Sequence, residues 1–173
     1  MTDNEFRTAF EDHKDAVFRF AWRMMTSRAA AEDVAQDVFL SLLRVSDRFD
    51  PTRGRLRSFL LGITRNLVLK RWRDEHQWEE LADEQFLAEP INVERSEIAQ
   101  IVAEAVQALP LLQREVLILA EYEEMSLEEI ARTVESEIGT VKSRLHRARE
   151  NLRRMLTPLK PKRVVRTNHG TVG

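Results

Sequence analysis

The chain has 173 residues, of which 43% are hydrophobic and 32% are charged, and its formal net charge at pH 7 is −2. Five glycines and five prolines are too few for a loop-rich β protein, so the composition indicates an all-α fold. The absence of cysteine excludes disulfides and thiolate metal sites, and no run approaches the roughly 18 consecutive apolar residues of a membrane span. With no basic-then-apolar leader after Met1, we expect a soluble protein that is not exported.

Apolar residues that recur at three- and four-residue steps predict helices in the first half of the chain. They mark one helix at Phe6, Phe10, Val17, Ala21 and Met24, and a second at Ala31, Val34, Ala35, Val38, Phe39 and Leu42. Asp50 and Pro51 can start a short helical turn, because proline is tolerated at the first helical position. A third helix is predicted over about 57–73, with one side strongly basic and the inward side formed by Phe59, Leu60, Ile63 and Leu67.

The periodicity weakens over residues 77–96, where acidic side chains are frequent and apolar anchors are few. We predict a flexible acidic linker in this segment. Its apolar residues either pack locally or dock on a partner: Trp78, Leu81, Phe86 and Leu87. The chain is therefore expected to form two small helical domains, 1–76 and 97–160, followed by a disordered basic tail at 161–173.

Periodicity resumes at Ile98, and this helix is expected to end at Leu109, because a residue before proline avoids the α region. Another helix is predicted over about 112–121. Ser126 then fits a capping box, in which its oxygen accepts the Glu129 amide while the Glu129 carboxylate reaches back to the Ser126 amide. The short helix that follows carries Ile130, Ala131 and Val134.

A brief turn at 135–137 leads to a last helix from about Ile138, with a predicted buried stripe of Val141, Leu145, Ala148 and Leu152. Two helices joined by a tight turn, the second basic on its outer side, indicate a DNA-binding helix-turn-helix. Base edges are within reach of Ser143, His146 and Arg147, and phosphates within reach of Lys142, Arg144 and Arg149. Thr140 and the preceding glycine are small residues near the helix start, where backbone amides can approach a phosphate.

An earlier basic cluster differs because it combines cations with aromatic side chains. Its candidate DNA contacts are Arg53, Arg55, Arg57, Arg65, Asn66, Lys70, Arg71, Trp72 and Arg73. Positive grooves with flat side chains hold single-stranded DNA, and stacking contributes about 1–3 kcal/mol per base. Phe49 and Phe59 are interpreted as core residues and Trp72 as the stacking candidate. Solvated helix faces are the alternative reading of both basic clusters.

The second predicted helix has an acidic and amide patch beside its buried face, formed by Glu32, Asp33, Gln36 and Asp37. Such a patch repels DNA and suits a basic groove or coiled coil of a partner protein. The alternative is a plain solvated surface.

Several segments, in order, resemble the extracytoplasmic-function sigma factors of the sigma-70 family. Residues 31–39 resemble the polymerase-binding helix, 49–54 and 58–66 the −10 recognition loop and melting helix, and 109–117 the start of the C-terminal domain. Residues 128–131 and 139–149 resemble the −35 reader, and the resemblance spans about residues 5–157. Departures are Glu135 where the family often has glycine, Lys70 where it often has aspartate and Phe59 where it often has tryptophan. Because glycine tolerates positive φ, we expect a reshaped or strained turn at Glu135.

The resemblance implies a dissociable specificity subunit of RNA polymerase that recognises −35 and −10 promoter elements, without a cofactor, a metal or catalysis of its own. It implies that Asp33, Gln36 and Asp37 face the clamp helices of core RNA polymerase, that a base flips near residues 49–57, and that the last helix lies on the −35 element. Further implied partners are the polymerase flap, promoter DNA and an anti-sigma factor. The implied location is the cytoplasm, in association with the nucleoid.

Three other functions compete with this hypothesis. A conventional helix-turn-helix regulator explains residues 112–157 but gives no role to the acidic patch or the aromatic-basic cluster. A protein-binding adaptor requires that DNA binding be absent. An enzyme is disfavoured because the four histidines are scattered, with no metal-binding spacing, nucleophile elbow or glycine-rich phosphate loop.

Overall fold

The computed structural model describes residues 1–76, 86, 88–91 and 97–159, and over these residues the chain is helical with no strand. The α-helices are α1 (Asp3–Met24), α2 (Arg28–Val45), α3 (Leu56–Glu75), α4 (Ile98–Ala108), α5 (Leu111–Leu117), α6 (Leu127–Thr133) and α7 (Ile138–Met155). Short 3-10 turns lie at η1 (Ser46–Arg48) and η3 (Thr157–Leu159), and η2 (Ile118–Tyr122) is π-helical. The predicted tail and most of the predicted linker, including Trp78, Leu81 and Leu87, lie outside the described residues.

The first domain consists of α1, α2 and α3, which pack on one another around large side chains such as Phe20, Leu42 and Leu60. Helix α1 begins with a reciprocal cap that sequence analysis did not predict: the Glu5 amide donates to Thr2 Oγ1 at 3.2 Å and the Thr2 amide to Glu5 Oε2 at 2.6 Å. Such a cap satisfies amides that lack partners within the helix. The three predicted helices of this half are confirmed.

The buried face of α3 differs from the predicted one. Its buried residues are Leu60, Leu61, Thr64, Val68 and Leu69, whereas Phe59, Ile63 and Leu67 are half-buried. The displacement has a physical reason, since α3 is covered by α1 and α2 and also contacts α6 of the second domain. A helix with neighbours on two sides cannot be divided into one inward and one solvated face.

The second domain consists of α4 to α7, in which α5 is central and packs on α7. Leu109 ends α4 in an extended conformation, as the following proline predicts. Val141, Leu145 and Ala148 of α7 are buried as predicted, but Leu152 is half-buried, and Asn151 takes a buried position instead. Asn151 Nδ2 donates to Gln113 Oε1 of α5 at 2.8 Å, and this hydrogen bond explains why an amide can lie inside the domain.

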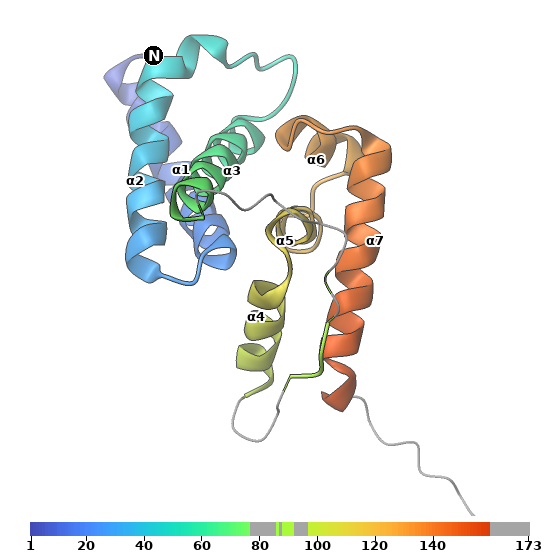
Figure 1. Cartoon of the computed structure of the whole chain (residues 1–173). Coiled ribbons are helices and arrows are strands. Elements are labelled where there is room, and N and C mark those ends of the chain that lie inside the picture. Colours follow the sequence, from blue (N-terminus) through green and yellow to red (C-terminus); the bar gives the residue numbers. More distant parts are fainter. Residues whose placement is uncertain (77–85, 87, 92–96, 160–173) are drawn as a thin grey trace, which may run out of the picture.

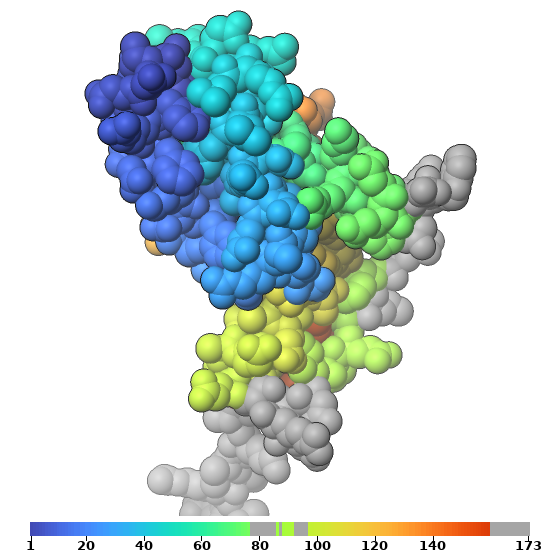
Figure 2. Space-filling model, turned by 90° about the vertical axis from the view of Figure 1, so that its left-hand side faces the viewer, coloured from blue at the N-terminus to red at the C-terminus, as the bar shows by residue number. Residues whose placement is uncertain are grey.

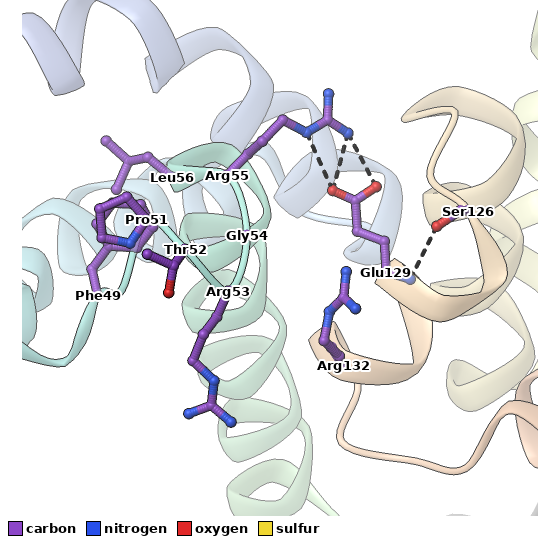
Figure 3. Close-up of a pocket in the computed structure, with 10 residues that line it drawn as sticks. All are labelled: Phe49, Pro51, Thr52, Arg53, Gly54, Arg55, Leu56, Ser126, Glu129 and Arg132. Atoms are coloured by element: carbon purple, nitrogen blue, oxygen red, sulfur yellow. Dashed lines mark hydrogen bonds and ion pairs between the residues drawn. The ribbon is translucent and has the colours of Figure 1, made fainter.

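The start of α6 confirms half of the predicted capping box. The Glu129 amide donates to Ser126 Oγ at 3.1 Å, but the Glu129 carboxylate does not reach back to Ser126. It turns toward the first domain and accepts two hydrogen bonds from Arg55 Nη2, each at 3.0 Å (Figure 3). A bidentate guanidinium contact is stronger than a neutral amide contact, and we attribute the altered cap to it.

Glu135 occupies the turn between α6 and α7 with φ of 53°, the left-handed conformation that glycine adopts at low cost. The Ser136 amide donates to Ala131 O at 3.0 Å and the Glu135 amide to Arg132 O at 3.4 Å. This pair of bonds is the Schellman motif that commonly ends helices on a glycine. The turn therefore keeps the glycine-type shape, at a cost of about 1 kcal/mol for a residue with a Cβ atom.

The two domains lie directly against each other (Figures 1 and 2). Helix α3 contacts α6, and α1 contacts both α4 and α5. One buried apolar cluster includes residues of both domains, and Phe86, Ala88 and Ile91 pack against it. The Ile91 amide donates to Met155 O at 3.1 Å, so this described part of the predicted linker packs locally on the second domain.

Candidate nucleic-acid and protein interfaces

The predicted −35 residues lie along one exposed side of α7. Thr140, Lys142, Ser143, His146, Arg147 and Arg149 are exposed, and Arg144 is half-buried at the edge of this surface. Arg144 Nη1 lies 3.4 Å from Ser136 Oγ, and Arg149 Nη2 lies 2.6 Å from Glu121 Oε1 in η2. Since the buried stripe of α7 faces α5, its basic side is presented outward as a continuous helical surface.

The predicted −10 residues fall into three groups. The first group is exposed and consists of Arg53 in the loop before α3 and of Asn66, Lys70 and Arg73 on α3. The three α3 residues follow one another at four- and three-residue steps, so they form one polar stripe. Arg53 precedes the start of α3, whereas Lys70 and Arg73 lie near its end, so the structure brings together only the three α3 residues.

The second group is held against the second domain. Arg65 Nε and Nη2 donate to the two oxygens of Glu115 at 2.8 and 3.1 Å. Arg57 is paired with Glu123, and Arg55 is paired with Glu129, which also accepts a hydrogen bond from Ser58. All three arginines belong to the predicted −10 surface, but each of them faces a carboxylate of the second domain.

Arg71 and Trp72 form the third group, near the end of α3. Arg71 Nη2 lies 3.5 Å from Asp33 Oδ2, which links α3 to the acidic patch on α2. The Trp72 ring is half-buried and stacks on His76, with ring centroids 4.3 Å apart and an interplanar angle of 11°. A base that stacked on this face of Trp72 would have to displace His76.

The loop before α3 meets α6 across an open pocket of about 760 Å³ (Figure 3). Its lining combines four cationic or carboxylate side chains with loop and cap residues: Phe49, Pro51, Thr52, Arg53, Gly54, Arg55, Leu56, Ser126, Glu129 and Arg132. Asp50 Oδ1 accepts hydrogen bonds from Thr52 Oγ1 at 2.7 Å and the Thr52 amide at 2.9 Å, and these bonds hold the Asp50 pKa below its usual value. These hydrogen bonds within the turn order the loop. The Phe49 and Phe59 rings pack on each other, with ring centroids 5.4 Å apart.

One carboxylate and one guanidinium group at the domain boundary have pKa values that differ from the usual ones. Burial raises the pKa of Glu129, but hydrogen bonds from Ser58 and Arg55 outweigh this effect and leave the pKa below its usual value. Burial lowers the pKa of Arg114 to about 10, and its guanidinium donates to the carbonyls of Met24, Gln107 and Leu109. Arg114 is therefore protonated at neutral pH and ties α5 to the end of α1.

The acidic patch on α2 is exposed, as predicted, at Asp33, Gln36 and Asp37. Sequence analysis missed that Leu40 and Leu43, which follow on the same side of the helix, are 47% and 52% exposed. The two exposed leucines, three positions apart, extend the acidic patch with apolar surface. The available signal was that neither leucine fits the buried stripe of α2, which includes Val38, Phe39 and Leu42. We call Asp33, Gln36, Asp37, Leu40 and Leu43 the acidic-leucine face.

The described ranges hold neither a metal-binding cluster nor a membrane-spanning helix. Within them, no group of three or more histidine, cysteine, aspartate and glutamate side chains is arranged to hold a metal ion. None of the helices described combines the length and hydrophobicity required to cross a bilayer.

Two family profiles match the chain, one in each domain. Sigma-70 region 2 matches residues 9–79, and Sigma-70 region 4 matches residues 99–152. These boundaries agree with the division into α1–α3 and α4–α7.

Named relatives are similar over most of this chain. It is 34% identical to the ECF RNA polymerase sigma factor SigE of Mycolicibacterium smegmatis over 82% of this chain and 57% of that protein. It is 30% identical to the ECF sigma factor SigW of Bacillus subtilis, over 89% of this chain and 90% of that protein. A similar solved structure is the sigma factor RpoE of Bartonella quintana in complex with the anti-sigma factor NepR, with a TM-score of 0.72, 28% identity, and coverage of 88% and 97%. The chain therefore belongs to the extracytoplasmic-function sigma factors of the sigma-70 family.

Proposed function

We propose that the chain joins core RNA polymerase through the acidic-leucine face of α2 and directs initiation by reading the −35 element with α7 and the −10 element with α3 and its preceding loop. The observation that carries this proposal is the separation of three surfaces of different chemistry on one small chain. A conventional regulator needs only the α7 surface. It has no use for an exposed acidic and apolar helix face.

The −35 assignment rests on the exposure and spacing of the α7 side chains. Ser143, His146 and Arg147 lie on its exposed side, within about one turn of one another. A major groove admits one α-helix, whose outward side chains can hydrogen-bond to base edges. Lys142 and Arg149 on the same helix supply phosphate contacts that set the position of the helix on the duplex.

The −10 assignment rests on the cationic stripe of α3 and the arginine-bearing loop before it. Asn66, Lys70 and Arg73 form an exposed track, and Arg53 is exposed in the adjoining loop. Backbone phosphates of a separated strand fit such a track, and a base that leaves the stack requires a nearby pocket. We propose that the loop at residues 49–56, which forms one wall of the pocket against α6, receives this base.

The polymerase assignment rests on the acidic-leucine face. Carboxylates beside exposed leucines match a partner helix pair with basic and apolar side chains, and a family resemblance names that partner as the clamp helices. We further propose that the second domain contacts the polymerase flap, that the chain has no catalytic activity of its own, and that it acts in the cytoplasm at the nucleoid. Because the similar structure of RpoE was solved with an anti-sigma factor, we also propose regulation by such a protein.

A pair of variants tests the separation of roles. Asp33→Ala/Gln36→Ala is expected to weaken binding to purified core polymerase at least tenfold and to leave binding to a −35 duplex unchanged. Arg147→Ala is expected to do the reverse. Asp15→Ala and Arg19→Ala, which change exposed α1 residues by the same charges, are the matched controls. Equal loss of both activities in either test variant would contradict the assignment.

A further inference from the structure

A pair of buried amide side chains joins α5 to α7 inside the second domain. Gln113 of α5 is 1% exposed and Asn151 of α7 is 6% exposed. Asn151 Nδ2 donates to Gln113 Oε1 at 2.8 Å, within the normal range of hydrogen-bond distances. The other buried polar residues in the described part of the chain are Thr64, Glu115 and Glu123, and none of them lies on α7. The amide pair therefore places a directional contact between the two helices.

The rest of the buried side of α7 is apolar. Its buried residues follow one another at three- and four-residue steps: Val141, Leu145, Ala148, Asn151 and Met155. This stripe packs on α5 (Figure 1). Because apolar contacts are not directional, they determine which side of α7 faces α5 but only loosely determine its rotation. In coiled coils, a single buried asparagine in an apolar seam fixes the register of the helices, at a cost in stability.

A competing rotation of α7 exists because Leu152 follows Asn151 directly. Leu152 is half-buried, and the three- and four-residue steps of the stripe fit it as well as they fit Asn151. Apolar burial alone favours a helix that turns Leu152 toward α5 and Asn151 toward water. Consecutive residues are about 100° apart around a helix, so such a turn also rotates the exposed side of α7. The hydrogen bond opposes this turn, because it would leave the buried Gln113 without Asn151.

A small rotation of α7 is enough to disturb contacts with bases. Side-chain ends lie about 5–6 Å from a helix axis, so a rotation of about 20° moves each of them by about 2 Å. Hydrogen bonds tolerate a spread of only about half an ångström in length. The proposed −35 contacts Ser143, His146 and Arg147 lie on the same continuous helix as Asn151. The rotation that Asn151 sets is therefore the rotation of these three side chains.

We propose that Gln113 and Asn151 are positioning residues for promoter recognition: their hydrogen bond holds α7 in the rotation that aligns its exposed side chains with the base edges of the −35 element. This inference rests on the proposed function of α7. Both residues are buried, so they act through α7 and not through DNA contacts of their own. The pair sets how well α7 distinguishes sequences. It adds little to stability, because apolar groups of the same shape stabilise a buried site about as well.

Replacing both amides with apolar groups of similar shape tests this role. Gln113→Met/Asn151→Leu is expected to keep the thermal unfolding midpoint of the wild type or to raise it. A −35 duplex is first selected from a pool of random duplexes with the wild-type chain. Fluorescence anisotropy then measures the affinity of each protein for this duplex and for a scrambled one. We expect the ratio of the two affinities to fall at least tenfold in the variant, with unchanged affinity and salt dependence on the scrambled duplex.

Two control variants separate the hydrogen bond from packing. Gln113→Asn/Asn151→Gln keeps one amide on each helix, so it is expected to bring the affinity ratio back to within about threefold of the wild type. Leu112→Met/Leu152→Met changes a half-buried apolar residue on each of the same helices and should leave the ratio unchanged. If the exchanged amides restore nothing, or if the methionine control loses the ratio as well, the hydrogen bond is not the cause and the proposal is overturned.

The results distinguish this role from the function on which it rests. If the wild-type chain enriches no sequence from the pool, the proposed function of α7 is contradicted. If the wild type discriminates between the duplexes and the apolar variant does so equally well, only the positioning role is wrong. An apolar variant that fails to fold, or that loses affinity for both duplexes alike, would show that the amide pair serves stability, which also contradicts positioning.

Discussion

The basic sides of α3 and α7 have similar compositions but different surroundings. On α7, the cationic residues lie on an exposed helix side, and Arg149 pairs with Glu121 of the same domain. On α3 and its preceding loop, Arg55, Arg57 and Arg65 meet carboxylates of the other domain. The difference teaches that a charge cluster predicts where a polyanion can bind, whereas the placement of opposite charges decides when it can bind.

The largest expected effect comes from breaking the buried pair. Arg65→Ala deprives the fully buried Glu115 of its guanidinium partner, which costs about 3–5 kcal/mol if the domains stay docked. We therefore expect the variant to unfold at a lower urea concentration than the wild type, and its two domains to unfold in separate transitions. Arg73→Ala, an exposed arginine of the same helix, should shift the curve by less than about 0.5 kcal/mol. Equal shifts would mean that the two arginines have equivalent environments, against the structure.

The next largest effect concerns the exposed helix. Arg147→Ala is expected to reduce affinity for a −35 duplex by about 1.4–3 kcal/mol, roughly 10- to 150-fold, because a base contact is lost. Lys142→Ala is expected to weaken all duplexes alike and to lower the salt dependence by about one charge. Fluorescence anisotropy at several salt concentrations measures both quantities. If Lys142→Ala changed sequence preference more than Arg147→Ala, the assigned contacts would have to be exchanged.

A smaller effect is expected at the turn that holds α7 in position. Glu135→Gly removes the Cβ atom from a left-handed residue and should stabilise the second domain by about 0.5–1 kcal/mol. Glu128→Gly, at an exposed helical position of α6, should destabilise it by about 1 kcal/mol. Thermal denaturation distinguishes the two. A destabilising Glu135→Gly would indicate that the left-handed turn is not adopted.

The smallest expected effect is a pH dependence of docking. The Glu129 pKa is lower in the docked protein than in the unfolded chain, so its contribution is present above its usual value of 4.5 and is lost as the pH falls through the docked value. Arg55 and Arg132 are the charges that favour the ionised form of Glu129. Fluorescence energy transfer between labels on the two domains measures docking. In the wild type, docking should weaken below pH 4.5. Glu129→Gln should lose this part of the pH dependence, and an unchanged profile would contradict the role of Glu129.

Much of the helical architecture was predictable from local signals. The apolar steps gave α1 and α2, and Leu109-Pro110 gave the end of α4. Contacts between the domains were not predictable, because Arg65 and Glu115 are 50 residues apart and neither has a local signature. For the same reason the predicted Glu129 cap was half wrong: its local partner is outcompeted by a distant guanidinium.

The residues of the candidate surfaces also differ in how far local sequence signals predict them. The α7 residues were predictable together because one helix presents them all, and its buried stripe identifies the opposite side. The −10 residues come from a loop and a helix that has neighbours on two sides, so their exposure depended on tertiary packing. Leu40 and Leu43 were missed although the sequence carried a signal, because neither leucine falls on the predicted apolar stripe of α2.

Run-off transcription with purified core polymerase and a library of promoter fragments tests the central claim most directly, namely that one chain with two cationic surfaces and an acidic-leucine face starts RNA synthesis at chosen sites. The account predicts transcripts that begin at a small set of fragments, that disappear with Asp33→Ala/Gln36→Ala, and that share sequence near both positions −35 and −10. A correctly folded chain that binds core polymerase yet starts no transcript on any fragment would contradict it.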